Sequence, residues 1–146
     1  MHIELIDEIT PEVVETFSRL MPQLVPNGKI PQAEYLQQIM DSPSNHLFAA
    51  YNPHMVGTLT LVIMQTPSGV KAWIEDVVVD SEARGQRIGE QLLQHAIAYS
   101  TRLGVSSINL TSRPERVAAN KLYASMRFVL RDTNVYRLNT DEIINV

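Results

Sequence analysis

The stretch RGQRIG, residues 84–89, combines residue types that suit an anionic ligand. Two arginines and two glycines lie there, directly before an amphipathic helical pattern. The first backbone amides of a helix lack intrahelical partners and carry partial positive charge, so they bind phosphate readily. Gly85 lets backbone approach a ligand closely, and Gly89 lets the helix pack tightly. The stretch indicates a phosphate-binding turn, and a solvated helix start is the alternative.

Arg87 stands where a second close-approach glycine would be useful. We expect ordinary helical dihedrals for this residue, with its side chain directed outward or onto a phosphate. Two other phosphate motifs fail on spacing. The Walker pattern GxxxxGKS or GxxxxGKT is absent, and the turn comes too late in the chain for a Rossmann GxGxxG fingerprint.

A second stretch, SRPERVAANKLYASMRF at residues 112–128, places polar side chains at helical spacing. Asn120 and Tyr123 lie three positions apart and share one face of the expected helix. A tyrosine in such a place is by default a half-buried packing residue. Its small alanine neighbours leave room for a ligand without requiring one.

Two carboxylates, Glu75 and Asp76, lie just before the β-branched run VVV at residues 77–79. Successive residues of a strand point to opposite faces, so these side chains diverge unless a β-bulge re-aims one of them. Glu75 shares its expected face with Trp73 and Val77 and is the preferred candidate. Ordinary edge or surface carboxylates are the alternative interpretation of both.

The elements that must position these residues alternate in type along the chain. Thr10 followed by Pro11 is a typical helix start, and Gly104 is a typical helix end. A buried strand, a long helix and another strand in succession form a right-handed βαβ crossover, so the fold class is α/β with a mixed sheet. Strands are expected at residues 2–6, 45–51, 55–66, 70–79 and 105–111, with a final hairpin from 128–130 and 134–138. Helices are expected from residue 11 to a loop at 21–31, around 35–40, and at 86–103 and 114–126.

The chain of 146 residues is 45% hydrophobic, which suits a single domain over residues 1–146. Its formal net charge of -4 at pH 7 gives no general attraction to nucleic acid or to anionic membranes. Without cysteine there is no thiolate nucleophile, and the histidines lack metal-ligand spacing. The charged start and the short apolar run at 55–64 predict neither a signal peptide nor a membrane span, and hence a cytoplasmic protein.

Together these stretches resemble the Gcn5-related N-acetyltransferase (GNAT) superfamily. In that family a strand ends in a valine-rich run, and the pattern Arg/Gln-x-x-Gly-x-Gly/Ala opens the next helix and binds the coenzyme A pyrophosphate. VVVDSEARGQRIGEQLL follows this pattern from Arg84 to Gly89, with Arg87 in place of the middle glycine. AANKLYASMRF is similar to the family signature AxxLYxxxGF, with Arg127 at the glycine. IEDVVVDSEARGQRIGEQLL is also similar to glucosamine-6-phosphate N-acetyltransferases, some of which lack the same glycine.

The resemblance implies a fold and a set of roles. The fold is a GNAT-like, mostly antiparallel central sheet with helices on both faces and a splayed strand pair that binds coenzyme A. Tyr123 is implied as the general acid that protonates the departing thiolate, and Glu75 or Asp76 as the base or the anchor of an ammonium group. The Val77 amide is implied to bind the acetyl oxygen. The implied coenzyme-binding residues are Val77, Val78, Val79, Arg84, Gly85, Gln86, Arg87, Ile88, Gly89, Asn120 and Tyr123.

The expected function is direct acetyl transfer from acetyl-CoA, as a cosubstrate, to a primary amine of a small molecule or a protein. A non-catalytic acyl-CoA sensor or binding module on the same fold is the alternative, and Tyr123 with the acidic pair favours the enzyme. No metal is expected. No motif names the acceptor, whose pocket we expect from residues 21–31 and the strand ends. Homodimers are common in the family, and a homodimer is an open alternative for this chain.

Overall fold

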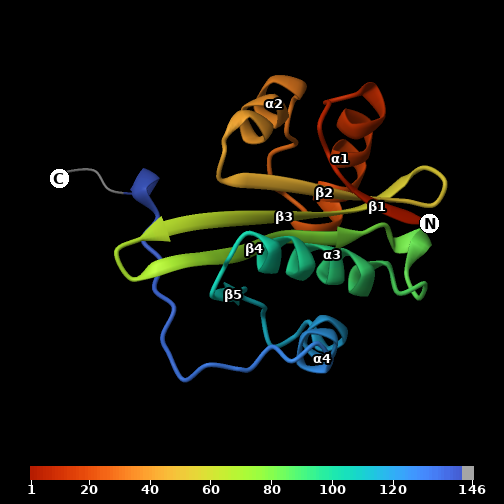
Figure 1. Ribbon diagram of the computed structural model, residues 1–146. Helices are drawn as coiled ribbons and strands as arrows, with labels where there is room; N and C mark the ends of the chain where they lie inside the picture. Colours follow the sequence, from red (N-terminus) through yellow and green to blue (C-terminus); the bar gives the residue numbers. More distant parts are fainter. Residues whose placement is uncertain (143–146) are drawn as a thin grey trace. The chain divides into compact units, whose positions relative to one another are not determined.

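A five-stranded sheet lies at the centre of residues 1–111 in the computed structural model, which describes residues 1–142 (Figure 1). β1 to β4 pair antiparallel, and β5 pairs parallel with β4. The mixed, mostly antiparallel sheet expected from the sequence is therefore confirmed. In their order across the sheet, the strands are β1 (His2–Leu5), β2 (Asn45–Tyr51), β3 (Met55–Thr66), β4 (Gly69–Val79) and β5 (Ser107–Asn109).

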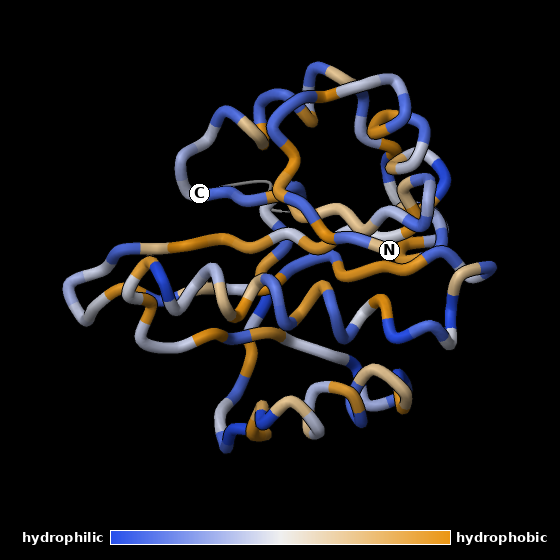
Figure 2. Tube along the Cα trace, turned by 45° about the vertical axis from the view of Figure 1, so that its right-hand side comes forward, coloured by the Kyte–Doolittle hydropathy of each residue, from blue (hydrophilic) through white to orange (hydrophobic). Residues whose placement is uncertain are grey.

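Helices cover both faces of this sheet, as expected. In Figure 1, α1 (Pro11–Leu24) and α2 (Ala33–Asp41) lie on one face and α3 (Ile88–Arg102) on the other. Successive residues of β2 explain the two layers, because Leu47 belongs to the buried cluster with α1 and α2. Its neighbour Phe48 instead meets the Tyr99 ring of α3 edge-on, with ring centroids 5.6 Å apart. Figure 2 shows hydrophobic residues concentrated along the strands between these layers.

The start of α1 follows the expectation, but its end does not. The Thr10 hydroxyl oxygen accepts a hydrogen bond from the Val13 amide at 3.2 Å, which caps the first turn. The helix then continues through Pro22, so the loop expected at residues 21–31 begins later than predicted. A proline in the last turn removes one backbone donor and leaves most of the helix ladder intact. The helix still closes with a bond of 2.8 Å from the Val25 amide to the Met21 carbonyl.

The crossover from β4 to β5 has the expected elements with shorter bounds. After Val79 the chain forms a 3-10 turn, η1 (Ser81–Ala83), and enters α3 at Ile88 rather than at residue 86. At the other end of the helix, Gly104 adopts a φ of 75°, a left-handed conformation that glycine takes without steric cost. β5 is limited to the three residues that pair with β4.

Residues 112–142 belong to a second compact unit, which we describe by itself. It contains α4 (Val117–Ser125) and a 3-10 turn, η2 (Thr140–Glu142). The helix expected at 114–126 is shorter than predicted, because the residues before Val117 form a turn closed from the Arg116 amide to the Arg113 carbonyl at 3.1 Å. The single domain expected from the sequence stays a prediction.

The hairpin expected from residues 128–130 and 134–138 is wrong. The structure assigns no strand between residues 128 and 138, and the side chains of Val129, Leu130 and Tyr136 are 82%, 99% and 88% exposed. The two short apolar runs on either side of Arg131 and Asp132 have the propensity to form strands. Their exposed side chains do not pack against a hydrophobic surface. An isolated hairpin is marginal without such a surface.

Within residues 1–142, no helix combines the length and the apolar character that crossing a membrane requires.

Candidate functional site

The β4 strand loses its neighbour halfway along. It pairs with β5 only through Lys71, Ala72 and Trp73, which face Ser107, Ile108 and Asn109. Beyond Trp73, no strand of residues 1–142 pairs with β4 on the β5 side, although β4 continues to Val79. This is the splayed geometry expected for the strand pair, and it leaves a strand edge whose backbone can pair with an extended ligand.

A β-bulge interrupts β4 at the two candidate carboxylates. Thr60 pairs with Glu75 and Thr58 pairs with Val78, so β4 has one more residue than β3 over this interval. The extra residue lies at Asp76 and Val77, and Asp76 has a φ of 51°. Side chains therefore do not strictly alternate between the two faces of the sheet at this point, and the β-bulge considered in the sequence analysis is present. Glu75 and Asp76 are both exposed.

The pKa of Glu75 is raised above its ordinary value. Burial of part of its side chain is the larger cause, and the negative charge of Asp76 is the smaller one. The two carboxylates are thus close enough to interact. A carboxylate with a raised pKa is a better proton acceptor near neutral pH than an ordinary one, which suits a general base.

The turn after β4 exposes backbone where the sequence predicted a phosphate site. Residues 84–87 are exposed, whereas Ile88 is buried and holds the start of α3 against the sheet. Gly85 has a φ of 81°, and apart from Gly85 itself and its two chain neighbours no residue places a heavy atom within 4 Å of the position that a Cβ would occupy there. The first turn of α3 has no side-chain cap, because Arg87 at the N-cap makes none. Its amides are therefore free to bind an anion.

The backbone of Arg87 differs from the expectation. Its φ is 59° and its ψ is 26°, a left-handed conformation rather than a helical one. Glycine adopts these angles without strain, whereas an arginine pays a steric penalty. The guanidinium Nε donates to the carboxylate of Glu90 at 2.9 Å, and the Arg87 side chain is 80% exposed. The expected contact between Arg87 and a phosphate stays a prediction.

In the second unit, Tyr123 and Asn120 have distinct surroundings. The Tyr123 side chain is buried and meets the Phe128 ring edge-on at 6.0 Å between centroids. Burial raises the pKa of its phenol, and the positive charge of Arg116 opposes that shift in part, so the phenol keeps its proton at neutral pH. Asn120 Nδ2 donates to the carbonyls of Arg113 and Arg116 at 2.9 and 2.8 Å, which ties down the turn before α4.

The comparison with known protein families agrees with these features. Residues 7–128 match the acetyltransferase (GNAT) family. The chain belongs to this family. The resemblance drawn from the two motifs is thereby confirmed, and family membership supports an acetyltransferase. GNAT enzymes use acetyl-CoA as a cosubstrate. No curated protein matches the sequence.

Solved structures share the GNAT fold over nearly the whole chain. A candidate acetyltransferase from Agrobacterium tumefaciens str. C58 has a TM-score of 0.83 and 22% identity, covering 95% of this chain and 100% of its own. An aminoglycoside acetyltransferase from an uncultured soil metagenomic sample, in complex with sisomicin, has a TM-score of 0.82 and 22% identity, covering 95% of both chains. A transcriptional regulator from Bacillus halodurans C-125 has a TM-score of 0.77 and 26% identity, covering 94% of this chain and 99% of its own.

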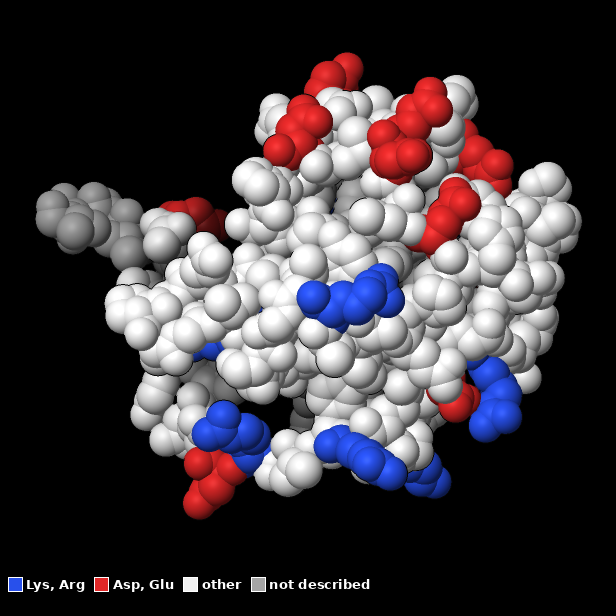
Figure 3. All heavy atoms as spheres, viewed as in Figure 1, with Lys and Arg blue, Asp and Glu red and all other residues white. Residues whose placement is uncertain are grey.

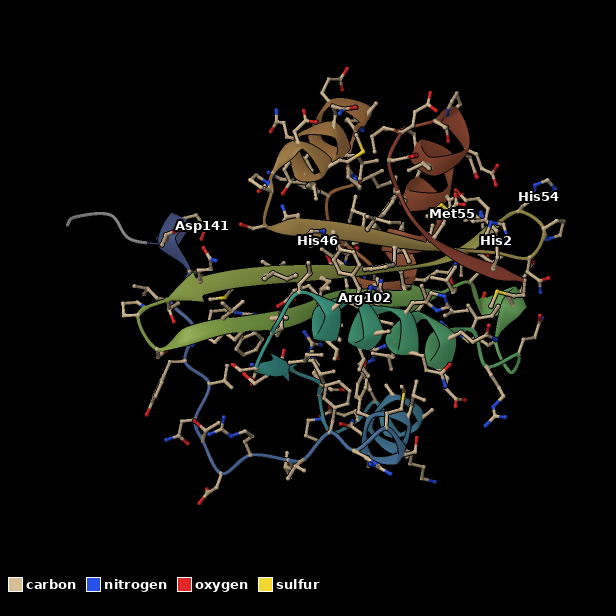
Figure 4. The ribbon with its side chains drawn as sticks, in the orientation of Figure 1. His2, His46, His54, Met55, Arg102 and Asp141 are labelled. Carbon is tan, nitrogen blue, oxygen red and sulfur yellow. The ribbon has the colours of Figure 1, made fainter. Side chains whose placement is uncertain are left out.

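The histidines of this GNAT chain lie on separate elements. Figure 4 shows His2 on β1, His46 on β2 and His54 in the turn between β2 and β3. Within residues 1–142, no three His, Asp or Glu side chains come together in a group that could hold a metal ion. His46 instead contacts the Tyr99 hydroxyl at 3.1 Å, and burial lowers the pKa of its ring.

The sequence interpretation missed the side chains that hold the turn after β4. Asp80 is the first residue after the strand, and its buried carboxylate pairs with Arg19 of α1. Gln23 of the same helix accepts a hydrogen bond from the Ser81 amide at 3.0 Å. A sequence signal existed, because Glu12, Arg19 and Gln23 lie at helical spacing on one polar stripe. The stripe does not, however, indicate which residues outside α1 these side chains contact.

Proposed function

We propose that this GNAT-family protein is an acetyl-CoA-dependent N-acetyltransferase that transfers acetyl directly to a primary amine of a small molecule or a protein. The observation that carries the proposal is the edge of β4, which is free of β5 after Trp73 and leads through η1 into the turn at 84–89. An extended pantetheine can pair with such an edge while the pyrophosphate reaches the free amides of the turn.

The residues of β4 and the turn suit acetyl-CoA in their chemistry. The Val77 amide, in the bulge, would donate to the acetyl oxygen as negative charge develops there. Val78 and Val79 would line the pantetheine. Gly85 and Gly89 would admit the pyrophosphate to the backbone, with the side chains of Arg84, Gln86 and Arg87 around it. Asn120 already uses its amide donors on the Arg113 and Arg116 carbonyls, so a contact with the coenzyme would use its Oδ1.

The reaction needs proton transfers that two side chains of this protein can supply. Glu75, helped by Asp76 or through a water molecule, would take the proton from the acceptor ammonium. The free amine then attacks the acetyl carbon, and the carbon–sulfur bond breaks. The phenol of Tyr123 would give its proton to the departing thiolate as the carbon–sulfur bond breaks, and the phenolate would then take the second proton from the nitrogen of the new amide, which restores the phenol.

The surface around α1 and α2 favours a cationic acceptor. Figure 3 shows acidic side chains over these helices. The exposed acidic residues of the two helices include Glu12 and Glu15 in α1 and Glu34 in α2. An amine that is protonated in solution is attracted to such a surface before it loses its proton. Aminoglycosides, which carry several amines, are the first acceptors to try, since one neighbour in structure is an aminoglycoside acetyltransferase. The location in the cytoplasm and the homodimer remain predictions.

The test is release of free thiol from acetyl-CoA in the presence of a panel of amines, with calorimetry of coenzyme A binding alongside. We expect binding, and thiol release above the amine-free rate with at least one aminoglycoside, polyamine or peptide amine. Binding without thiol release for any amine would favour the acyl-CoA sensor. An absence of coenzyme A binding would overturn the proposal as a whole.

A further inference from the structure

The carboxylate of Asp80 is held in an unusual place for an acidic side chain. It lies at the end of β4 with its side chain only 9% exposed. One oxygen accepts a hydrogen bond from the Glu82 amide at 3.2 Å, which caps η1. The other oxygen pairs with the guanidinium of Arg19, from α1. A carboxylate removed from water is costly unless it is paired in this way, so the pair is a strong constraint on where the chain leaves β4.

Arg19 connects this point to the start of β3. Its Nη2 donates to the Met55 carbonyl at 3.3 Å, and the amide of Met55 donates to Glu12, also on α1, at 2.8 Å. Figure 4 shows Met55 beside α1, at the base of the turn that carries His54. The Asp80 amide in turn donates to the Val56 carbonyl at 2.8 Å. The end of β4, the start of β3 and α1 therefore meet at one place.

Gln23 extends the same set of contacts into η1. Its Nε2 donates to the Arg19 carbonyl at 3.3 Å, one helical turn earlier, and its Oε1 accepts from the Ser81 amide at 3.0 Å. Farther along the turn, Asn52 donates to the Gln86 side chain at 2.9 Å. We call Arg19, Gln23 and Asp80 the turn anchor.

We propose that the turn anchor positions the coenzyme-binding turn, with Arg19 and Asp80 acting as positioning residues rather than catalytic ones. Gly85 and the uncapped start of α3 give the turn few constraints of its own. A turn that is already ordered does not have to lose conformational entropy when the pyrophosphate binds, so the anchor raises affinity for coenzyme A without touching it. This inference rests on the proposed function.

The decisive variant is Asp80→Asn, which keeps the size of the side chain and an oxygen for the Glu82 amide but removes the charge. The matched control is Glu15→Gln, because Glu15 is the other carboxylate that pairs with Arg19 and lies on α1 rather than in the turn. We expect Asp80→Asn to weaken coenzyme A binding, measured by calorimetry, by roughly fivefold or more, with the KM for acetyl-CoA rising in parallel. The kcat at saturating acetyl-CoA should stay within about twofold, and Glu15→Gln should leave the Kd within about twofold.

A double variant tests whether Arg19 acts through Asp80. Arg19→Met combined with Asp80→Asn should bind coenzyme A no more weakly than Asp80→Asn alone, because each change by itself already breaks the ion pair between Arg19 and Asp80. Amide hydrogen exchange of the ligand-free protein should be faster at residues 82–89 in Asp80→Asn and unchanged in Glu15→Gln. If Asp80→Asn does not fold, Gln23→Ala provides the same two measurements without disturbing a buried charge.

The outcomes separate this inference from the proposed function. Wild-type protein that does not bind coenzyme A would refute the proposed function itself. Wild-type protein that binds, together with a folded Asp80→Asn variant of equal affinity or unchanged exchange, would overturn the turn anchor alone. A variant that loses thermal stability but keeps its affinity would show that the pair serves folding and does not position the turn.

Discussion

Residues 75–89 and residues 112–138 are both assigned parts of the proposed chemistry, yet the structure holds them by different means. The first region is held by the pairing of β4 with β3, and by side chains from α1 and from the turn between β2 and β3. In the second region the contacts described above are local, such as those from Asn120 to Arg113 and from Tyr123 to Phe128. Apolar side chains such as Leu130 remain exposed there.

This difference separates two kinds of function. A binding turn gains from distant anchors, because order before binding lowers the entropic cost of capturing a ligand. The proton donor proposed at Tyr123 instead has local surroundings, namely burial and one aromatic neighbour, which affect its proton rather than the binding of the coenzyme. Substitutions in the turn at residues 84–89 should therefore change coenzyme affinity, and substitution of Tyr123 should change the rate of the chemical step.

The largest effect is expected in the second region. Tyr123→Phe keeps the ring that packs on Phe128 and removes the phenolic proton. General acid–base catalysis contributes roughly 10²–10⁴-fold, so kcat should fall at least ~10-fold even if water replaces the phenol in part. The Kd for coenzyme A should change little. The measurement is kcat of both proteins from about pH 6 to about pH 11, with the best amine from the panel.

The pH profile gives this prediction a second readout. Because burial raises the pKa of the phenol above its ordinary value of about 10, the alkaline loss of wild-type activity that comes from Tyr123 should begin only above about pH 10, and that limb should be missing in the variant. A Phe variant within twofold of wild type, with chemistry shown to limit the rate, would make Tyr123 a packing residue.

The next largest effect is expected at the turn. Gly89→Glu places bulk and negative charge on the first turn of α3, beside the amides proposed for the pyrophosphate. Coenzyme A binding should weaken at least tenfold, which corresponds to about 1.4 kcal/mol. Calorimetry on the variant, after circular dichroism has shown that it folds, provides the check. Equal affinity in a folded variant would remove the turn from the coenzyme site.

A smaller effect is expected at Arg87, where one substitution should raise the stability of the fold and lower the affinity for coenzyme A. Arg87→Gly relieves the left-handed backbone and should raise the free energy of unfolding by about 1 kcal/mol. It also removes a charge proposed to meet a phosphate, so coenzyme A affinity should fall roughly two- to fivefold and become less sensitive to salt. Thermal denaturation and calorimetry at two salt concentrations measure the two quantities.

Glu90→Gln is the matched variant, because it frees the Arg87 guanidinium from its partner in α3. Affinity for coenzyme A should hold or improve in this variant. Tighter binding in Arg87→Gly, or weaker binding in Glu90→Gln, would contradict the role given to this arginine.

The smallest effect is a shift in pH dependence at the bulge. Asp76→Asn removes the negative charge that raises the pKa of Glu75, and asparagine tolerates the left-handed backbone there. As pH falls, activity is lost when Glu75 takes up a proton, so the variant should keep kcat/KM down to a lower pH than the wild type. Glu75→Gln should abolish this acid limb. An unmoved limb in Asp76→Asn would exclude Glu75 as the base.

The same contrast explains what the sequence could predict. Strands β2 and β3 have the predicted bounds because their β-branched and apolar runs are closed by turn residues such as Pro53. The exposed glycine-bearing turn before α3 also follows from six residues of sequence, whereas its binding of phosphate stays a prediction. By contrast, the bulge at Asp76 depends on the register of β4 against β3, which no local pattern determines.

Long-range partners were the part that the sequence could not supply. The pair of Arg19 and Asp80 joins side chains from distant elements, and each residue by itself reads as an ordinary surface charge. The failed hairpin at 128–138 is the converse case. Its apolar residues have the propensity for strands, but propensity alone does not provide a neighbouring strand.

The free edge of β4 beyond Trp73 also bears on how the protein behaves when no ligand covers it. An unpaired, valine-rich edge is a template on which another polypeptide can add a strand, the first step of aggregation. Charges on such an edge and a bulge that twists it both discourage this addition, and here Glu75, Asp76 and the bulge lie together at that place. We therefore expect Glu75 and Asp76 to limit self-association of the ligand-free protein, so that replacing both with apolar residues would shorten its lifetime in concentrated solution.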